Sequence, residues 1–101
     1  MDVLGTSVGG DIYGQIANTT AMFGFVNVAN AQVGGDVYGI KGGNIVTAGV
    51  VTVSNSNLNK SVYGGYSTGG VSTSSNVTVS NSNIKGDIYG GFSANGNASF
   101  N

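Results

Sequence analysis

Three aspartates recur at one position of a repeated phrase, and they are the first side chains in this sequence that could do chemistry. Asp11, Asp36 and Asp87 share the position, and Ser61 occupies it in the third repeat. If the repeats stack as β-strands, about 4.8 Å apart, the carboxylates repel each other unless water or a cation separates them. A Ca²⁺ site is one interpretation. The glycine-rich nonapeptide of calcium-binding repeats is absent, so we favour aspartates that accept hydrogen bonds from turn N–H groups.

The residue types that enzymes use most often are absent. The chain contains no His, Cys, Glu or Arg, so a nucleophile–base pair or a triad cannot be assembled from the usual side chains. Two aspartates from neighbouring repeats could imitate the carboxylate pair of a glycosidase. However, the sequence indicates neither a cleft nor a feature that would make one of them the general acid. We therefore predict that the protein is not an enzyme, and we predict no metal or cofactor site.

A column of tyrosines is the most regular chemical feature. The column consists of Tyr13, Tyr38, Tyr63 and Tyr89. Each of these four follows an aliphatic residue and precedes a glycine, so in a regular strand the aliphatic residue faces inward and the tyrosine outward. An exposed tyrosine ladder could stack on sugar rings or on a partner's surface, and the alternative is that the rings stack on each other. The candidate ligand or partner face consists of Tyr13, Tyr38, Tyr63, Tyr89, Tyr66 and Phe92.

A repeat of about 25 residues sets these spacings. Residues 51–67 read VTVSNSNLNKSVYGGYS, and residues 77–93 read VTVSNSNIKGDIYGGFS. Self-similarity at such a period indicates a solenoid, a propeller or an array. The Tyr-Gly steps lie 25, 25 and 26 residues apart, and we place the extra residue of the third unit within residues 72–76. The chain divides into the units 1–25, 26–50, 51–76 and 77–101.

The composition favours short strands and turns. Nineteen Gly and abundant Ser, Asn and Thr disfavour helix, whereas 40% of the residues are hydrophobic and Val recurs. A unit of this length with about three strands closes naturally when the chain winds once per unit and like residues stack on like. A propeller blade needs more residues, about 40, and a sandwich does not require near-identical residues at a fixed period. We predict an all-β parallel solenoid of four coils, forming a single domain over residues 1–101.

The predicted core follows from the register of the repeats. Three columns of aliphatic residues face inward, and each is buried only when neighbouring coils stack. A polar column of Asn30, Asn55 and Asn81, with Asn57 above Asn83, is expected to form an amide ladder. The core columns are Val3, Val28, Val53 and Val79; Val8, Val33, Leu58 and Ile84; and Ile12, Val37, Val62 and Ile88.

The phrase VTVSNSNIKGDIYGGFSANGNAS resembles the Gly/Ser/Asn-rich repeats in the passenger regions of bacterial autotransporter adhesins and related large surface proteins. Those repeats often read as an apolar-Thr-apolar strand, a polar corner, and then Gly-Asp-apolar-Tyr-Gly-Gly-Tyr-Ser. The resemblance covers nearly the whole chain, most closely residues 51–99. It implies a parallel β-helix, an extracellular or cell-surface location, and a stalk or adhesin role. The sequence departs from the family in showing no signal peptide, no translocating barrel and no comparable length.

Charge narrows the possible partners. Three Lys and four Asp give a net charge of −1, which does not provide the clustered positive charge that nucleic-acid binding requires. No apolar run approaches the roughly 20 residues of a membrane-spanning helix. Few charges also leave little repulsion between molecules. We therefore expect neither nucleic-acid binding nor membrane insertion, and we expect association between copies.

The four whole units, with little that would cap either end, predict the function. Open coil edges favour joining to another copy, and contacts that do not close on themselves generate filaments. We predict a structural protein that stacks head to tail into an extracellular filament, or the equivalent repeat block of a surface fibre. The alternative is an adhesin module that binds glycan or a host protein through the tyrosine face. An ice-binding solenoid is a third interpretation, although only Thr52 and Thr78 form an outward rank.

Overall fold

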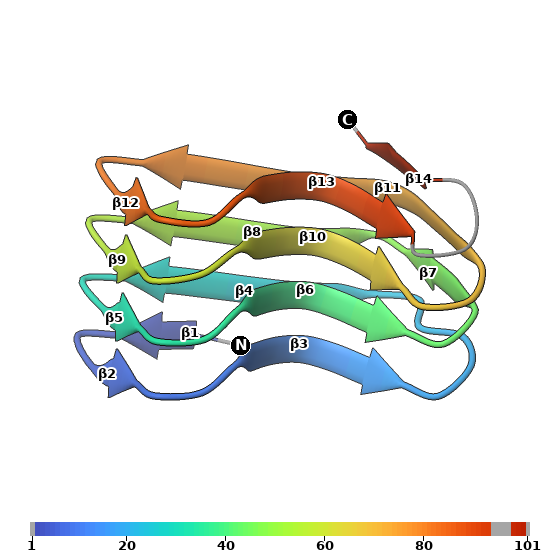
Figure 1. The fold of residues 1–101 in the computed structure, drawn as a ribbon, viewed down its shortest axis with the longest axis horizontal. Coiled ribbons are helices and arrows are strands. Elements are labelled where there is room, and N and C mark those ends of the chain that lie inside the picture. The colour runs from blue at the N-terminus through green and yellow to red at the C-terminus, as the bar shows by residue number, and fades with distance from the viewer. Residues whose placement is uncertain (1, 94–97, 101) are drawn as a thin grey trace.

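Short parallel strands wind around one axis in the computed structural model, which describes residues 2–93 and 98–100. Each turn of the chain forms a flattened coil, and successive coils stack in the direction from the N-terminus to the C-terminus (Figure 1). The coils wind with a right-handed sense, the sense that parallel strand connections almost always take. All described ladders are parallel, so the prediction of a parallel β-solenoid of four coils is confirmed.

The strands form three sheets, named here by their place in Figure 1. The front sheet contains β3 (Ile12–Ala17), β6 (Val37–Gly42), β10 (Val62–Ser67) and β13 (Ile88–Ser93). The corner sheet contains β2 (Ser7–Val8), β5 (Gln32–Val33), β9 (Asn57–Leu58) and β12 (Asn83–Ile84). The rear sheet contains β1 (Asp2–Leu4), β4 (Gly24–Ala29), β8 (Gly49–Ser54), β11 (Val71–Ser80) and β14 (Ala98–Phe100), with β7 (Ile45–Thr47) beside β11.

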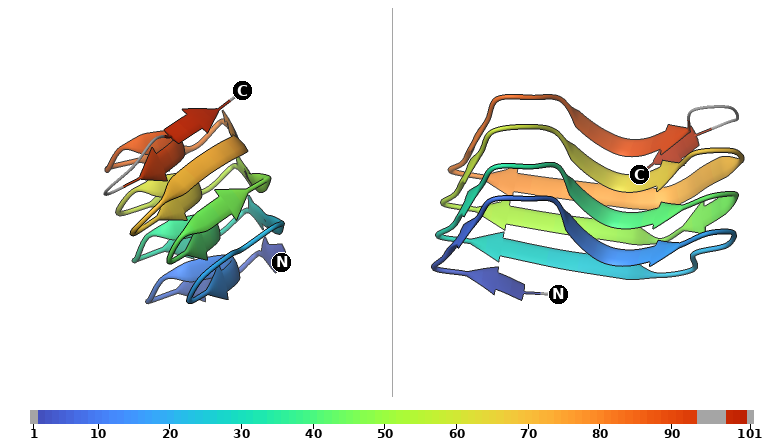
Figure 2. Two further views of the ribbon diagram at one scale, coloured as in Figure 1. Left: turned by 90° about the vertical axis from the view of Figure 1, so that its right-hand side faces the viewer. Right: turned by 60° about the horizontal axis from the view of Figure 1, so that its bottom comes forward.

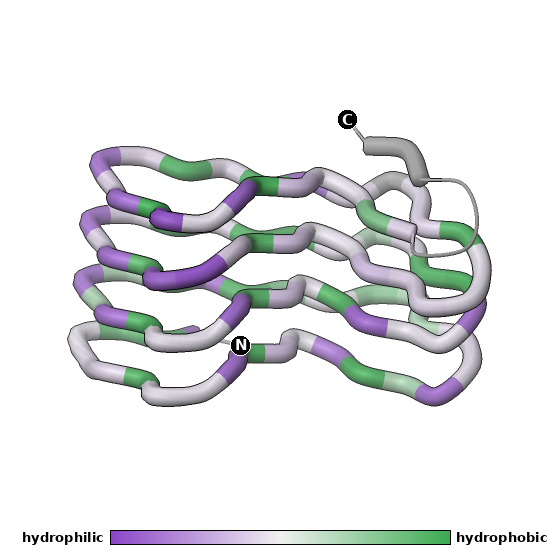
Figure 3. The backbone as a smooth tube through the Cα atoms, in the orientation of Figure 1, coloured by the Kyte–Doolittle hydropathy of each residue, from purple (hydrophilic) through white to green (hydrophobic). Residues whose placement is uncertain are grey.

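Like residues stack on like throughout the three sheets. Val28 pairs with Val3 and with Val53, and Tyr38 pairs with Tyr13 and with Tyr63. The predicted columns are therefore confirmed as structural columns. Figure 3 shows the same register as hydrophobic segments that align from one coil to the next.

The extra residue of the third coil lies earlier than the sequence suggested. Ser67 pairs with Gly42, an offset of 25, whereas Val71 pairs with Ile45, an offset of 26. The insertion therefore falls within residues 68–70, and its placement within 72–76 was wrong. Residues 68–70 form the turn between β10 and β11, where an added residue disturbs no ladder. The polar run that follows pairs in register with β7 and β8 instead.

The core fills the space between the front and rear sheets. Val28, Val37, Val53 and Val62 are fully buried. A smaller cluster of Ala21, Ile40 and Val46 fills the other end of the first and second coils, and it was not predicted from the sequence. The main cluster consists of Val3, Ile12, Val26, Val28, Ala31, Val33, Val37, Val51, Val53, Leu58 and Val62.

One predicted core residue, Ile88, is exposed, and three others are only partly buried. Ile88 lies in register above Val62, but 51% of its surface is exposed. Val79 and Ile84 are only partly buried in the same coil, and Val8 is only partly buried in the first coil. The columns are correct, and the difference arises because β14 covers only part of β11, and no described strand pairs with the upper side of β12 or β13. The described residues include no helix long and apolar enough to cross a membrane.

The glycines of the first three Tyr-Gly steps, Gly14, Gly39 and Gly64, lie against backbone atoms of both the neighbouring coil and the rear sheet. The front strands dip toward the rear strands in the right-hand view of Figure 2. A Cβ added to Gly39 would lie 2.5 Å from the Gly64 carbonyl oxygen and 3.0 Å from the Val50 amide nitrogen. Because these neighbours are backbone atoms, they cannot move aside without distorting two coils. The repeated Tyr-Gly step therefore reflects close packing of backbone against backbone.

We predict that Gly39→Ala lowers the free energy of unfolding by about 1–3 kcal/mol, the usual cost of forcing extra atoms into a packed interior. Gly9→Ala is the matched control, because a Cβ there meets nothing within 4 Å. That control should leave stability unchanged or raise it by less than about 1 kcal/mol. Equilibrium denaturation in urea measures both variants. Equal stability of the two would contradict the close approach of the sheets.

Candidate functional site

The tyrosine column forms a continuous stack of rings on the outer side of the front sheet. The ring centroids of Tyr13 and Tyr38 lie 5.0 Å apart, and those of Tyr38 and Tyr63 lie 4.9 Å apart. Tyr63 and Tyr89 continue the stack at 4.9 Å, and neighbouring rings are parallel to within 6°. The spacing follows from the strand separation, because each tyrosine occupies the same position of a parallel strand. The interpretation of the column as a self-stacked ladder is confirmed.

A second row of side chains packs against this ladder. The Tyr66 ring lies edge-on to Tyr63, at 5.1 Å and 90°, and it stacks with Phe92 at 4.8 Å. In the second coil the same position carries Lys41, whose Nζ lies 5.2 Å from the centre of the Tyr38 ring. Such aromatic and cation–π contacts contribute roughly 0.5–1.5 kcal/mol each beyond simple burial. The second row thus stabilises the ladder by packing against one side of it.

The prediction that the whole ladder is exposed is wrong for its second member. Tyr38 is only 7% exposed, although it lies on the outer side of the sheet. Tyr13 and Tyr63 cover its two faces, and Tyr66 and Lys41 cover its edge. Tyr13, Tyr63 and Tyr89 remain partly exposed. A flat ligand therefore cannot reach the ring faces inside the ladder, and it can reach only ring edges and the outermost faces.

The carboxylates of the aspartate column accept hydrogen bonds from the hydroxyl groups of the tyrosine ladder. The Tyr13 hydroxyl donates to the Asp11 carboxylate at 3.4 Å, and the Tyr89 hydroxyl donates to Asp87 at 3.2 Å. Tyr38 donates to Asp36 in the same way. In each case the aspartate precedes the tyrosine by two residues, so both side chains project from the same side of the strand. The repeated Asp-apolar-Tyr order thus has a local structural role.

The same carboxylates also link one coil to the next. Asp11 accepts the amide of Asp36 at 2.7 Å, and Asp36 accepts the amide of Ser61 at 2.9 Å. The Ser61 hydroxyl then accepts the amide of Asp87 at 3.0 Å. The interpretation of these residues as acceptors of turn N–H groups is confirmed. In the part of the chain that the structure describes, no three acidic, His or Cys side chains group closely enough to hold a metal ion.

The environment of the ladder raises the pKa of its phenols. Burial is the main cause of the upward shift in the pKa of Tyr38, and the charge of Asp36 adds to it. Burial followed by the Asp36 charge also raises the pKa of Tyr63. For Tyr89 the hydrogen bond to Asp87 is the first cause of a raised pKa. The phenolate form is disfavoured because it would be poorly hydrated and close to carboxylates.

Serines, and not asparagines, form the ladder at the corner between the rear and corner sheets. The Ala31 amide donates to Ser56 Oγ at 3.1 Å, and the Ser56 amide donates to Ser82 Oγ at 3.1 Å. Each serine hydroxyl in turn donates to a carbonyl of its own coil, as Ser82 does to Ser80 at 2.8 Å. Ser56 is buried. These bonds tie the corner of one coil to the corner above it.

The predicted amide ladder is absent from the described residues. Asn30, Asn55 and Asn81 instead adopt the left-handed backbone conformation, with φ of 53°, 49° and 49°. Asn tolerates this region better than most residues with a Cβ, because its short polar side chain bonds locally. Gly5 holds the same place in the first coil, with φ of 62°. The asparagine column was correctly identified as a corner, but the corner conformation, and not amide bonding, explains it.

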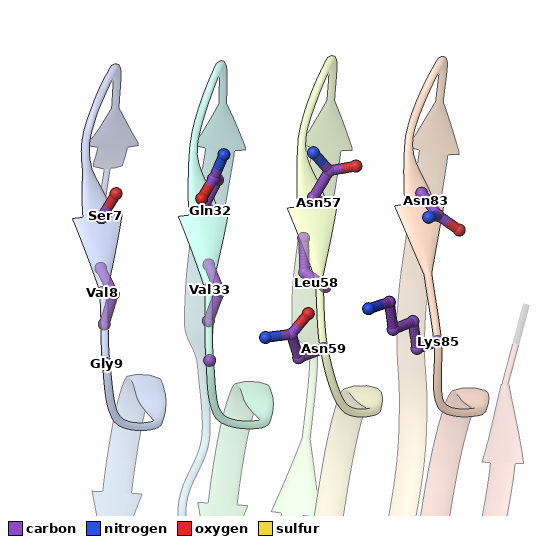
Figure 4. Close-up of a pocket in the computed structure, with 11 residues that line it drawn as sticks. Ser7, Val8, Gly9, Gln32, Val33, Asn57, Leu58, Asn59, Asn83 and Lys85 are labelled. Carbon is purple, nitrogen blue, oxygen red and sulfur yellow. The ribbon is translucent and has the colours of Figure 1, made fainter.

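A polar groove of about 490 Å³ runs along the corner sheet. Ser7, Gln32, Asn57 and Asn83 form a row along it, one from each coil, and no hydrogen bond joins these described side chains to each other (Figure 4). Lys85 contributes a positive charge at the fourth coil. The groove was not predicted from the sequence, because each corner strand shows only one polar residue before its aliphatic residue, a pattern that many exposed strands share.

Comparison with protein-family models, with curated protein sequences and with solved structures found no match to this chain. The function is therefore argued from the geometry of the columns. The resemblance to autotransporter passenger repeats remains an expectation from the sequence.

We predict that the protein loses stability as pH rises above the ionisation range of unfolded tyrosine, about pH 10. The ladder phenols have a raised pKa in the folded state, so the unfolded chain releases its protons first. Their contribution to stability is therefore complete below that range and is lost as pH rises toward the folded pKa values. Ultraviolet titration of phenolate, combined with urea unfolding at each pH, measures both quantities.

Tyr38→Phe is the control for this prediction. It keeps an aromatic ring in the stack but removes the phenol with the most strongly buried environment. The variant should lose less stability than the wild type over the alkaline range. A free energy of unfolding that stays constant between about pH 9 and pH 11 in the wild type would contradict the raised pKa values.

Proposed function

We propose that this protein is a structural, self-stacking β-solenoid. Its coils bind the coils of further copies edge to edge, and a filament or part of a surface fibre grows along the solenoid axis. An extracellular or cell-surface location is part of the proposal and is supported by the resemblance to autotransporter passenger repeats. The partner is a second copy of the same chain.

The exposure of Ile88 carries this proposal. The same column is fully buried at Val37 and Val62, whereas Ile88 at the upper edge of the fourth coil is 51% exposed. A further coil above β13 (Ile88–Ser93) and β12 (Asn83–Ile84) would bury it. Unpaired parallel strands also leave amide and carbonyl groups that pair with another chain unless something covers or repels it.

The energetics support joining of copies. Each added interface gives a ring of backbone hydrogen bonds, worth about 0.5–1.5 kcal/mol each, and it buries apolar columns at about 25 cal/mol per Å². Association costs about 4–15 kcal/mol in lost freedom of motion. A ring of some ten bonds together with three aliphatic columns exceeds that cost on this scale. The net charge of −1 adds little repulsion between copies.

We predict that the wild type forms filaments at micromolar concentration and that Ile88→Lys prevents their growth. The lysine would place a charge where the next coil must pack, and burying an unpaired charge is costly. Ile45→Lys is the matched control, because Ile45 is 46% exposed but belongs to the second coil, between other coils. Size-exclusion chromatography and negative-stain microscopy measure the outcome. A wild type that remains a discrete monomer of 10.0 kDa contradicts the proposal.

Binding of glycan or a host protein through the outer aromatic surface is the second candidate function. The observation that favours it is the cluster of partly exposed Tyr66 and Phe92 beside the charged Lys41. Because the inner ring faces are covered, the ligand would contact ring edges and the second row. Tyr66→Ser should then abolish binding on a glycan array or to host-cell surfaces and leave filament formation intact. Absence of binding by the wild type would count against this function.

A further inference from the structure

One ladder of side chains joins each coil to the coil above it through acceptors in the lower coil. Asp11 accepts the amide of Asp36, and Asp36 accepts the amide of Ser61. Ser61 then accepts the amide of Asp87 through its hydroxyl. A carboxylate and a hydroxyl therefore both act as the acceptor at this position. The last residue of the ladder is Asp87 in the fourth coil, and it places an acceptor on the upper edge.

A second ladder runs in the opposite direction, with its acceptor in the upper coil. Ser56 accepts the amide of Ala31, and Ser82 accepts the amide of Ser56. Thr6 occupies the equivalent place in the first coil, because the next residue along, Ser7, pairs with Gln32. The lower edge of the first coil therefore carries a hydroxyl at the position where the serine ladder uses one.

Both ladders end in groups that have no hydrogen-bond partner among the described residues. In the part of the chain that the structure describes, Asp87 Oδ1 accepts no hydrogen bond, whereas Oδ2 accepts the Tyr89 hydroxyl. The amides of Ser82 and Asp11 and the hydroxyl of Thr6 likewise have no partner among the described residues. The upper edge thus offers one acceptor and one donor, and the lower edge offers the complementary donor and acceptor.

We propose that these four groups set the register and direction in which copies join. In the junction, Asp87 of one copy accepts the Asp11 amide of the next, and the Ser82 amide donates to the Thr6 hydroxyl of the next. This inference rests on the proposed self-stacking function and adds to it a defined, polar interface. Each bond repeats a contact that already joins adjacent coils within the chain.

The aromatic ladder continues across the same junction. Tyr89 forms the upper end of the stack and Tyr13 the lower end, so the register set by the two hydrogen bonds brings the Tyr13 ring of the next copy above Tyr89. Within the chain this spacing is 4.9–5.0 Å. A slip by one residue would point every side chain to the opposite face of the sheet. The hydrogen bonds and the ring stack therefore select the same alignment.

Joining by two upper edges would reverse the strand direction across the junction, so it would repeat none of the parallel contacts that join adjacent coils within the chain. Copies therefore add head to tail, and each filament has two different ends.

The experiment compares removal of each acceptor with its conservative replacement. Asp87→Ala and Thr6→Val remove the acceptors, whereas Asp87→Ser and Thr6→Ser keep a hydroxyl, as Ser61 and Ser82 do in the structure. Sedimentation of assembled full-length chains gives the soluble concentration that remains at equilibrium. Asp87→Ala and Thr6→Val should each raise it roughly twofold to tenfold, the effect of losing one hydrogen bond. The two serine variants should stay within about twofold of the wild type.

Thermal unfolding of dilute, unassembled chains is the accompanying control. Thr6 and Asp87 are exposed, and within the chain Asp87 loses only its exposed bond to the Tyr89 hydroxyl, so all four melting temperatures should change little. Soluble concentrations at the wild-type value in all four variants would overturn this inference and leave self-stacking intact. Equal loss of assembly in the alanine and serine variants at position 87 would overturn the acceptor role of Asp87. A wild type that does not assemble would overturn both the inference and the proposed function.

Discussion

Parallel pairing of each residue with its equivalent one coil away is the constraint on which this structure depends. Backbone hydrogen bonds fix the coil separation, and every side-chain column inherits that spacing. Aliphatic columns become a core, tyrosines become a ring stack, and aspartates and serines reach the amides of neighbouring coils. No column is stable in a single coil, because each contact needs an equivalent residue above or below it. Repetition in the sequence is thus the source of both stability and specificity.

Different columns contribute different things to this stacking. The apolar columns supply most of the driving force, because the free energy gained by burying apolar surface is large. That free energy has little directional preference. The Asp and Ser ladders contribute less energy but depend on the alignment of one donor with one acceptor. The ring stack is intermediate, because it buries area and also requires parallel rings. A polar interface on a solenoid therefore selects among alignments that the core alone would accept.

The fold and register could be predicted because repeated residues identify their own partners. Val28 and Val53, or Tyr38 and Tyr63, occupy equivalent places in consecutive units, and the structure pairs them. Details within a coil were less accessible. The burial of Tyr38 depends on Lys41 and Tyr66 from the neighbouring row, and the role of Asn55 depends on a left-handed φ. Neither property follows from spacing along the chain.

The direction of the hydrogen bonds has a mechanical consequence. The bonds between coils lie along the solenoid axis, whereas the covalent chain runs across it within each strand. A force applied along the axis is therefore carried largely by hydrogen bonds, stacked rings and packed side chains. A force applied across the axis acts on the covalent backbone. A fibre built from these coils would be stiff and strong across its width and more readily parted along its length.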